Sequence, residues 1–177
     1  MKRLLFCMLV FLVPSNLFSF DFELDGIYYN IKNDSEVEVT YGSSRDGVKV
    51  YPSIVAIPSK VTWKGTEYKV TTIGQKSFSN CKTLEYIYIP SSISVIGSYA
   101  FERCFYLTTI SIPKGVVEIG KRAFSTCSHL DSIYISNTVK TIGECAFEWC
   151  DNLTSVTIPN SVNKIGNSIF YYCIYEA

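Results

Sequence analysis

Cysteine is the residue type with the most evident chemistry in this sequence, and five of the seven cysteines recur at intervals of 23 residues. They are Cys81, Cys104, Cys127, Cys150 and Cys173. In an exported chain, several cysteines suggest disulfides. If the repeats stack, however, these side chains point in parallel from successive coils about 4.8 Å apart, and five of them cannot all pair. The regular spacing favours a ladder of buried thiols that pack as small apolar side chains.

One cysteine, Cys145, lies outside this pattern. Its equivalents in the other repeats are Lys76, Tyr99, Arg122 and Ser168, which are residue types that favour the surface. We therefore expect Cys145 to be exposed and name it as the candidate for a reactive or intermolecular thiol. An inert free cysteine is the alternative.

Catalytic and metal-binding motifs are missing from the sequence. The single histidine, His129, falls at a variable repeat position without a carboxylate or nucleophile fixed beside it, so we expect a surface residue. No C-x₂-C pair indicates zinc, and no phosphate loop or nucleophile elbow occurs. We predict no enzyme, no cofactor and no metal site.

The elements that would position these residues are repeats of fixed length. Isoleucine–glycine pairs, phenylalanines and cysteines all recur at the same 23-residue step, and such self-similarity indicates a stacked solenoid. The pairs begin at Ile73, Ile96, Ile119, Ile142 and Ile165. The phenylalanines are Phe78, Phe101, Phe124, Phe147 and Phe170.

One coil of the array can be interpreted physically. The stretch "LTTISIP" (107–113) alternates so that Ile110 and Ile112 face inward, which is typical of a half-buried strand. Gly120 permits a turn. The following "KRAFSTC" (121–127) is predicted to be a helical turn or a short 3₁₀ segment. The chain then arrives one strand spacing further along the stack.

The segment ahead of the array contains a diverged first repeat. Its Ile57-Pro58 matches the later Ile89-Pro90, but extra residues centred on "WKGTEY" separate it from the next isoleucine–glycine pair. Lys64-Gly65 is a favourable turn, so we predict a β-hairpin there. Alternating strands joined by a "KNDSE" turn precede it. An atypical first unit covers the end of a solenoid core.

These patterns predict a β-rich repeat solenoid of the leucine-rich repeat type, with a 23-residue period, short helical or 3₁₀ turns and an N-terminal β cap. The cap and diverged repeat occupy residues 21–69, and the array occupies residues 70–173. Residues 174–177 form a tail with no further strand, so the last coil is expected to be open. A frayed end, a covering chain or a truncated longer parent would each explain it, and the oligomeric state stays open.

Residues 70–173 resemble the BspA-like subgroup of leucine-rich repeats, whose pattern is approximately L-x-x-I-x-I-P-x-x-V-x-x-I-G-x-x-A-F-x-x-C. The departures are mild: Ser77 and Ile169 replace alanine, Ser136 replaces proline, and Val156 replaces isoleucine. The resemblance implies a curved solenoid on exported or surface-attached proteins. In some members it implies adhesion to host matrix proteins, host cells or other microbes.

The strand residues that face away from the core form two columns of tyrosine, serine and threonine. The columns are Tyr86, Thr109, Ser132 and Ser155, and Tyr88, Ser111, Tyr134 and Thr157. A curved solenoid places such columns on a concave binding surface. Hydroxyls and aromatic rings suit recognition of a protein or glycan. The alternative is that these residue types are simply favourable at exposed strand positions.

The N-terminal residues 1–20 resemble a secretory signal peptide. Lys2 and Arg3 precede an apolar run at residues 4–13, and Pro14 and a small residue, Ser19, follow. The run is too short to span a membrane. We therefore predict a secreted or cell-surface protein without a transmembrane segment. The formal net charge of zero argues against a nucleic-acid partner. A structural spacer, or a remnant of a longer repeat protein, is the alternative function.

Overall fold

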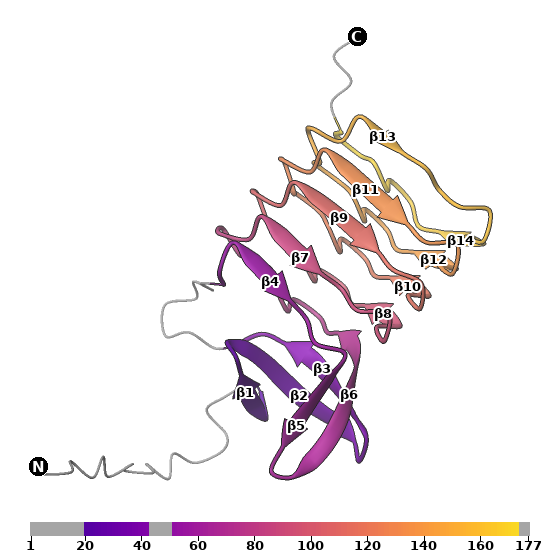
Figure 1. Ribbon diagram of the computed structural model, residues 1–177. Coiled ribbons are helices and arrows are strands. Elements are labelled where there is room, and N and C mark those ends of the chain that lie inside the picture. Colours follow the sequence, from indigo (N-terminus) through magenta and orange to yellow (C-terminus); the bar gives the residue numbers. More distant parts are fainter. Residues whose placement is uncertain (1–19, 43–50, 174–177) are drawn as a thin grey trace, which may run out of the picture.

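The repeats stack as successive coils, and each coil contributes short strands to two rows on different sides of the stack (Figure 1). The computed structural model describes residues 20–42 and 51–173. The predicted tail at 174–177 and all of the predicted signal peptide except Phe20 lie outside these residues. The predicted β-rich solenoid with an N-terminal β cap is confirmed.

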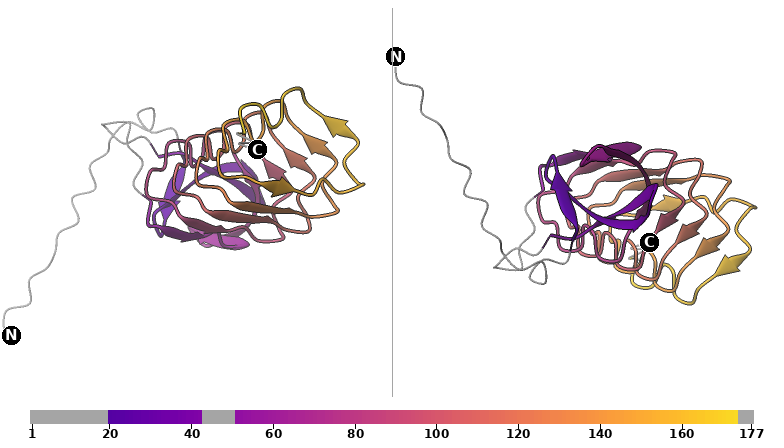
Figure 2. Two further views of the ribbon diagram at one scale, coloured as in Figure 1. Left: turned by 90° about the horizontal axis from the view of Figure 1, so that it is seen from above. Right: turned by 90° about the horizontal axis from the view of Figure 1, so that it is seen from below.

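The cap consists of two antiparallel units that join side by side. One is a three-stranded meander of β1 (Phe22–Leu24), β2 (Ile27–Asn33) and β3 (Glu36–Thr40). The other is the hairpin of β5 (Lys60–Trp63) and β6 (Thr66–Ile73), and β6 pairs in parallel with β3. Seen from below in Figure 2, the cap strands lie across the N-terminal end of the stack. The division predicted between residues 69 and 70 falls within β6 and stays a prediction.

The predicted hairpin turn at Lys64-Gly65 is confirmed. Lys64 has φ 49° and Gly65 has φ 82°, and two consecutive positive φ angles are what a type I′ hairpin turn requires. A second hairpin turn of this kind, at Asp25 (φ 51°) and Gly26 (φ 77°), joins β1 to β2. The sequence reasoning did not single out that turn, although Asp-Gly is a strong hairpin signal.

Two rows of parallel strands run along the coils. The back row continues the cap sheet from β6 through β8 (Val95–Ile96), β10 (Glu118–Ile119), β12 (Thr141–Ile142) and β14 (Lys164–Ile165). The front row comprises β4 (Ile54–Ala56), β7 (Tyr86–Tyr88), β9 (Thr109–Ile112), β11 (Ser132–Ile135) and β13 (Ser155–Val156). Its strand ladder is interrupted between β7 and β9, so β4–β7 and β9–β11–β13 are separate sheets.

A stack of phenylalanine rings fills the centre of the coils. Rings of adjacent coils lie 5.1–5.6 Å apart between centroids, with interplanar angles of 1–16°. Phe78, Phe101, Phe124 and Phe147 have no exposed surface, whereas Phe170 in the last coil is partly exposed. Because Phe101, Phe124 and Phe147 each pack between two other rings of the stack, the core is continuous along the array.

The prediction of helical or 3₁₀ turns is wrong, because the structure contains no helix among residues 20–42 and 51–173. The segments 97–104 and 120–127 instead contain consecutive tight turns with positive φ at every fourth residue, such as Arg122 (φ 51°) and Thr126 (φ 62°). Positive φ is incompatible with a right-handed helix. The alternate amides are then free to bond to the next coil, as Phe124 N does to the carbonyl O of Ala146 at 2.8 Å.

Gly120 illustrates why each coil carries a glycine after its isoleucine. Its φ lies outside the left-handed region, so the expected conformational role is not the cause. A Cβ atom at this position would approach Ser98 N to 2.6 Å and Gly97 C to 2.7 Å. The glycine is therefore needed because the backbones of two coils approach closely there.

The ring stack predicts that loss of a phenylalanine lowers the free energy of unfolding more inside the array than in its last described coil. Phe124→Ala should lower the free energy of unfolding by about 3–5 kcal/mol, because a cavity forms between two neighbouring rings. The matched substitution Phe170→Ala should cost clearly less, since that ring is partly exposed and has one stacked neighbour in the described residues. Urea titration followed by circular dichroism measures both. Equal losses would contradict the stacking account.

Candidate functional site

The front row brings the two predicted columns together on one surface. In parallel register, Thr109 pairs with Ser132 and then Ser155, and Ser111 pairs with Tyr134. All eight predicted residues are exposed in the structure. We call this surface the strand face, and it consists of Tyr86, Tyr88, Thr109, Ser111, Ser132, Tyr134, Ser155 and Thr157. A ligand-binding role for it stays a prediction.

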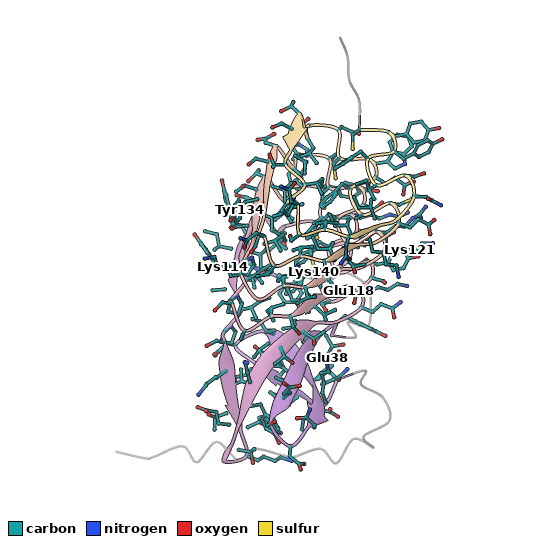
Figure 3. The ribbon with its side chains drawn as sticks, turned by 90° about the vertical axis from the view of Figure 1, so that its right-hand side faces the viewer. Glu38, Lys114, Glu118, Lys121, Tyr134 and Lys140 are labelled. Atoms are coloured by element: carbon teal, nitrogen blue, oxygen red, sulfur yellow. The ribbon has the colours of Figure 1, made fainter. Side chains whose placement is uncertain are left out.

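Packing on the opposite side of each strand holds these side chains outward. In β9, Ile110 and Ile112 are at most 2% exposed, and in β11 the equivalent isoleucines are at most 8% exposed. Since a strand alternates its side chains, the intervening residues must face solvent. Tyr134 and Tyr88 are the most exposed of the column tyrosines, at 60% and 65%. Tyr134 marks this side of the molecule in Figure 3.

The chemistry of the strand face is uncharged hydrogen bonding and aromatic contact. The Thr109 and Ser132 hydroxyls lie 3.2 Å apart, so neighbouring coils can present linked hydroxyl groups. Charged residues flank the columns: Glu85 and Asp131 precede strands of the front row, and Lys114 follows β9. Such a surface can bind neutral polar groups and stack on flat ones, and the flanking charges can orient a partner.

Sequence reasoning missed that the strand face begins one strand earlier. Ile54 and Ala56 of β4 stand in register with Tyr86 and Tyr88 and are exposed. The match of Ile57-Pro58 to Ile89-Pro90 could have revealed this earlier strand, because the same offset in the sequence aligns β4 with β7. The extra hairpin residues concealed it by breaking the 23-residue step.

The recurring cysteines form the predicted ladder, and all described cysteines are free thiols. Cys81, Cys104, Cys127 and Cys150 are fully buried. A further regularity was not predicted: each thiol from the second rung onward donates to the carbonyl oxygen of a phenylalanine in the preceding coil. The distances are 3.0 Å for Cys104 to Phe78, 3.2 Å for Cys127 to Phe101, 3.2 Å for Cys150 to Phe124 and 3.0 Å for Cys173 to Phe147.

Burial makes the ladder thiols poor nucleophiles. It raises the pKa of Cys127 to about 12 and the pKa of Cys104 well above its usual range, because a thiolate loses its hydration in the core. These thiols stay protonated near neutral pH, and the thiolate is the reactive form. The ladder is therefore structural.

The expected exposure of Cys145 is wrong, since this residue is only 6% exposed. Its thiol lies next to the Arg122 side chain, which comes from the equivalent position of the preceding coil and forms a 3.2 Å ion pair with Glu148. A cysteine side chain is much shorter than an arginine or lysine, so it remains beneath its neighbour. A reactive role for Cys145 stays a prediction.

His129 lies at the surface, as expected, and its ring contacts Tyr106 at 5.2 Å between centroids. Its nearest side-chain partner is the Ser128 hydroxyl, 3.4 Å from Nδ1. Within the part of the chain that the structure describes, no group of three or more histidine, cysteine or acidic residues is placed to hold a metal ion. The same residues include no helix able to cross a membrane.

Comparison with known families shows which family of repeats this chain belongs to. The model of the BspA-type leucine-rich repeat region matches residues 59–176 with six copies. The chain belongs to this family. The match covers the cap hairpin as well as the regular coils. The interpretation of the segment before residue 70 as a diverged repeat stays a prediction.

Solved structures of bacterial leucine-rich repeat proteins are similar to this chain. A leucine-rich repeat protein from Bacteroides ovatus is 38% identical, with a TM-score of 0.78 over 87% of this chain and 39% of that one. The T. pallidum leucine-rich repeat protein is 29% identical, with a TM-score of 0.74 over 86% of this chain and 67% of that one. A leucine-rich repeat protein from Bacteroides capillosus is 26% identical, with a TM-score of 0.54 over 87% and 94%. Curated proteins include no match.

The burial of the thiols predicts the order in which they react. With a maleimide at pH 8, Cys173 should be modified first, because it is the only partly exposed thiol among the described cysteines. Cys104, Cys127 and Cys145 should react only after unfolding in urea. Site-resolved mass spectrometry measures each position. Prompt modification of Cys104 or Cys127 would contradict the ladder, whereas prompt modification of Cys145 would support its role as a reactive thiol.

Proposed function

We propose that this chain is a secreted or cell-surface binding module that recognises protein or glycan partners through its strand face. One observation carries the proposal: eight uncharged hydroxyl and aromatic side chains stand exposed in two columns along the front row of the stacked coils. Tyrosine supplies contact area at a low entropic cost, and serine and threonine adapt their hydrogen bonds to a partner. Adhesion is the activity that such an extended surface suits.

The family supports this location and this type of activity. BspA-type repeat proteins are typically surface or secreted bacterial proteins, and leucine-rich repeats generally serve binding or structural roles rather than catalysis. The basic and apolar pattern of residues 1–20 agrees with export. The chain spans 39% of the length of the Bacteroides ovatus relative.

A structural spacer without a ligand of its own is the second candidate function. The observation that favours it is the continuous stack of phenylalanine rings, in which successive coils hold one another without any contribution from the strand face. In a spacer, the stacking surface would matter and the strand face would not.

Removal of the column tyrosines tests the two functions against each other. The variant Tyr86→Ala/Tyr88→Ala/Tyr134→Ala should have an affinity at least about tenfold lower than that of the wild type, since exposed tyrosines are frequent binding hot spots. The affinity is compared for the target that the wild type binds most tightly. The targets are a panel of immobilised extracellular-matrix proteins and a glycan array. Measurement is by biolayer interferometry.

The matched control for this variant is Tyr171→Ala/Tyr172→Ala. These tyrosines are each 50% exposed but lie in the last turn segment rather than on the strand face. The control should keep the full affinity. Unchanged binding by the strand-face variant would sink the proposal, and the absence of any target on the panel and the array would favour the spacer.

A further inference from the structure

The outer edge of β4 carries main-chain groups that none of the described strands pairs with. On its inner side, the Ser53 carbonyl accepts from Tyr86 N at 2.9 Å and Ile57 N donates to the Tyr88 carbonyl at 3.0 Å. Alternate residues of a strand in a parallel ladder bond to opposite sides. The amide and carbonyl groups of Ile54 and Ala56 therefore point away from β7. Among the described residues, β7 is the only strand that pairs with β4.

A cavity of about 210 Å³ lies beside this edge, between β4 and the turn that joins β1 to β2. Its lining is mostly apolar, and it includes Leu24, Ile27, Tyr29, Tyr51, Val55 and Pro58. Figure 1 shows β4 at the N-terminal end of the front row, directly above the cap. The cavity is large enough for one apolar side chain that enters from the edge.

Tyr51, one of the residues that line the cavity, carries a buried hydroxyl group without a hydrogen-bond partner among the described residues. The residue is 3% exposed. Burial also raises the pKa of Tyr51, so the group stays protonated and can donate. A buried donor without an acceptor is costly, and a ligand that brings an acceptor would relieve that cost.

We propose that the outer edge of β4 and this cavity bind an extended segment of a partner polypeptide, which adds to the front row as a strand. Its main chain pairs with Ile54 and Ala56, one apolar side chain fills the cavity, and a carbonyl accepts from the Tyr51 hydroxyl. This is the β-augmentation mode of peptide recognition. This site adjoins the strand face, because Ile54 and Ala56 stand in register with Tyr86 and Tyr88. It uses the main-chain edge and the cavity rather than the eight column side chains, so the proposal goes beyond the proposed function.

The residues around the edge define the segment further. Pro52 and Pro58 flank β4 and cannot donate to a ladder, so they limit the added strand to a few residues. Ile54 is 55% exposed and offers apolar contact on the outer surface. The exposed carboxylate of Asp25 also lines the cavity, which favours a lysine or arginine next to the apolar residue of the partner.

A phage-displayed library of random eight-residue peptides, selected on the full chain, identifies a binding sequence. Selected peptides should share an apolar residue with a basic neighbour in an extended, alternating pattern. The affinity of a fluorescent peptide of that sequence is then compared between variants. Ile54→Pro should weaken binding at least tenfold, because it removes the outward amide while leaving the bonds to β7 intact. Ile54→Val, which keeps the amide, should bind normally.

Two measurements keep the test decisive if the proline variant fails to fold. Tyr51→Phe deletes only the hydroxyl, so it should lower the affinity for the peptide severalfold while the fold is retained. Hydrogen exchange by NMR should show rapid exchange at the amides of Ile54 and Ala56 in the free protein and at least tenfold protection with peptide bound, while Val55 is protected in both states.

Several results would overturn the proposal. They are a failure to select any peptide, equal affinity of Ile54→Pro and Ile54→Val, and full affinity of Tyr51→Phe. Protection of the Ile54 and Ala56 amides in the dilute free protein would show that the edge is already paired. Protection that rises with protein concentration, together with a doubled mass in sedimentation, would identify a second copy of this chain as the occupant instead.

Discussion

Close contact between successive coils is the constraint on which the rest of this structure depends. The phenylalanine rings of neighbouring coils are 5.1–5.6 Å apart, which is about one strand spacing. At that distance, a Cβ on Gly120 would collide with the backbone of the coil before it. The same proximity lets each ladder thiol reach a carbonyl oxygen of the preceding coil. Glycine, phenylalanine and cysteine thus recur for one reason, which is the spacing itself.

This constraint also separates the residues that hold the coils together from those free to recognise a partner. Inward positions such as Ile110 and Phe124 are buried between two neighbouring coils. A substitution at such a position therefore disturbs the packing of both neighbours. Outward positions such as Thr109 and Tyr134 contact few core atoms. Variation at the outward positions therefore costs little stability, and binding specificity can reside there.

Much of this arrangement could be predicted from the sequence, because the step of 23 residues aligns every inward position with its equivalents. The turn segments could not, since Lys76, Tyr99, Arg122 and Cys145 differ in type yet all have positive φ. That backbone angle follows from coil-to-coil hydrogen bonding rather than from the residue itself. The burial of Cys145 was missed because the repeat position alone does not show that its short side chain lies next to Arg122 of the preceding coil.

The first coil differs from the later ones because its front strand, β4, has main-chain groups that are unpaired among the described residues, and these groups lie beside the cap. In the front row, β7 and β9 lie beside each other although their ladder is interrupted, so each has a neighbouring strand on both sides. Among the described strands, β4 has a neighbour on one side only, since the cap sheet continues only the back row. The cap covers the core there without pairing the front row. An unpaired strand edge usually invites uncontrolled association, and short strands and prolines are the usual protection. Here Pro52 and Pro58 confine the unpaired edge to a few residues beside a cavity. The edge is therefore protected from uncontrolled association and can still select a partner whose side chain fits the cavity.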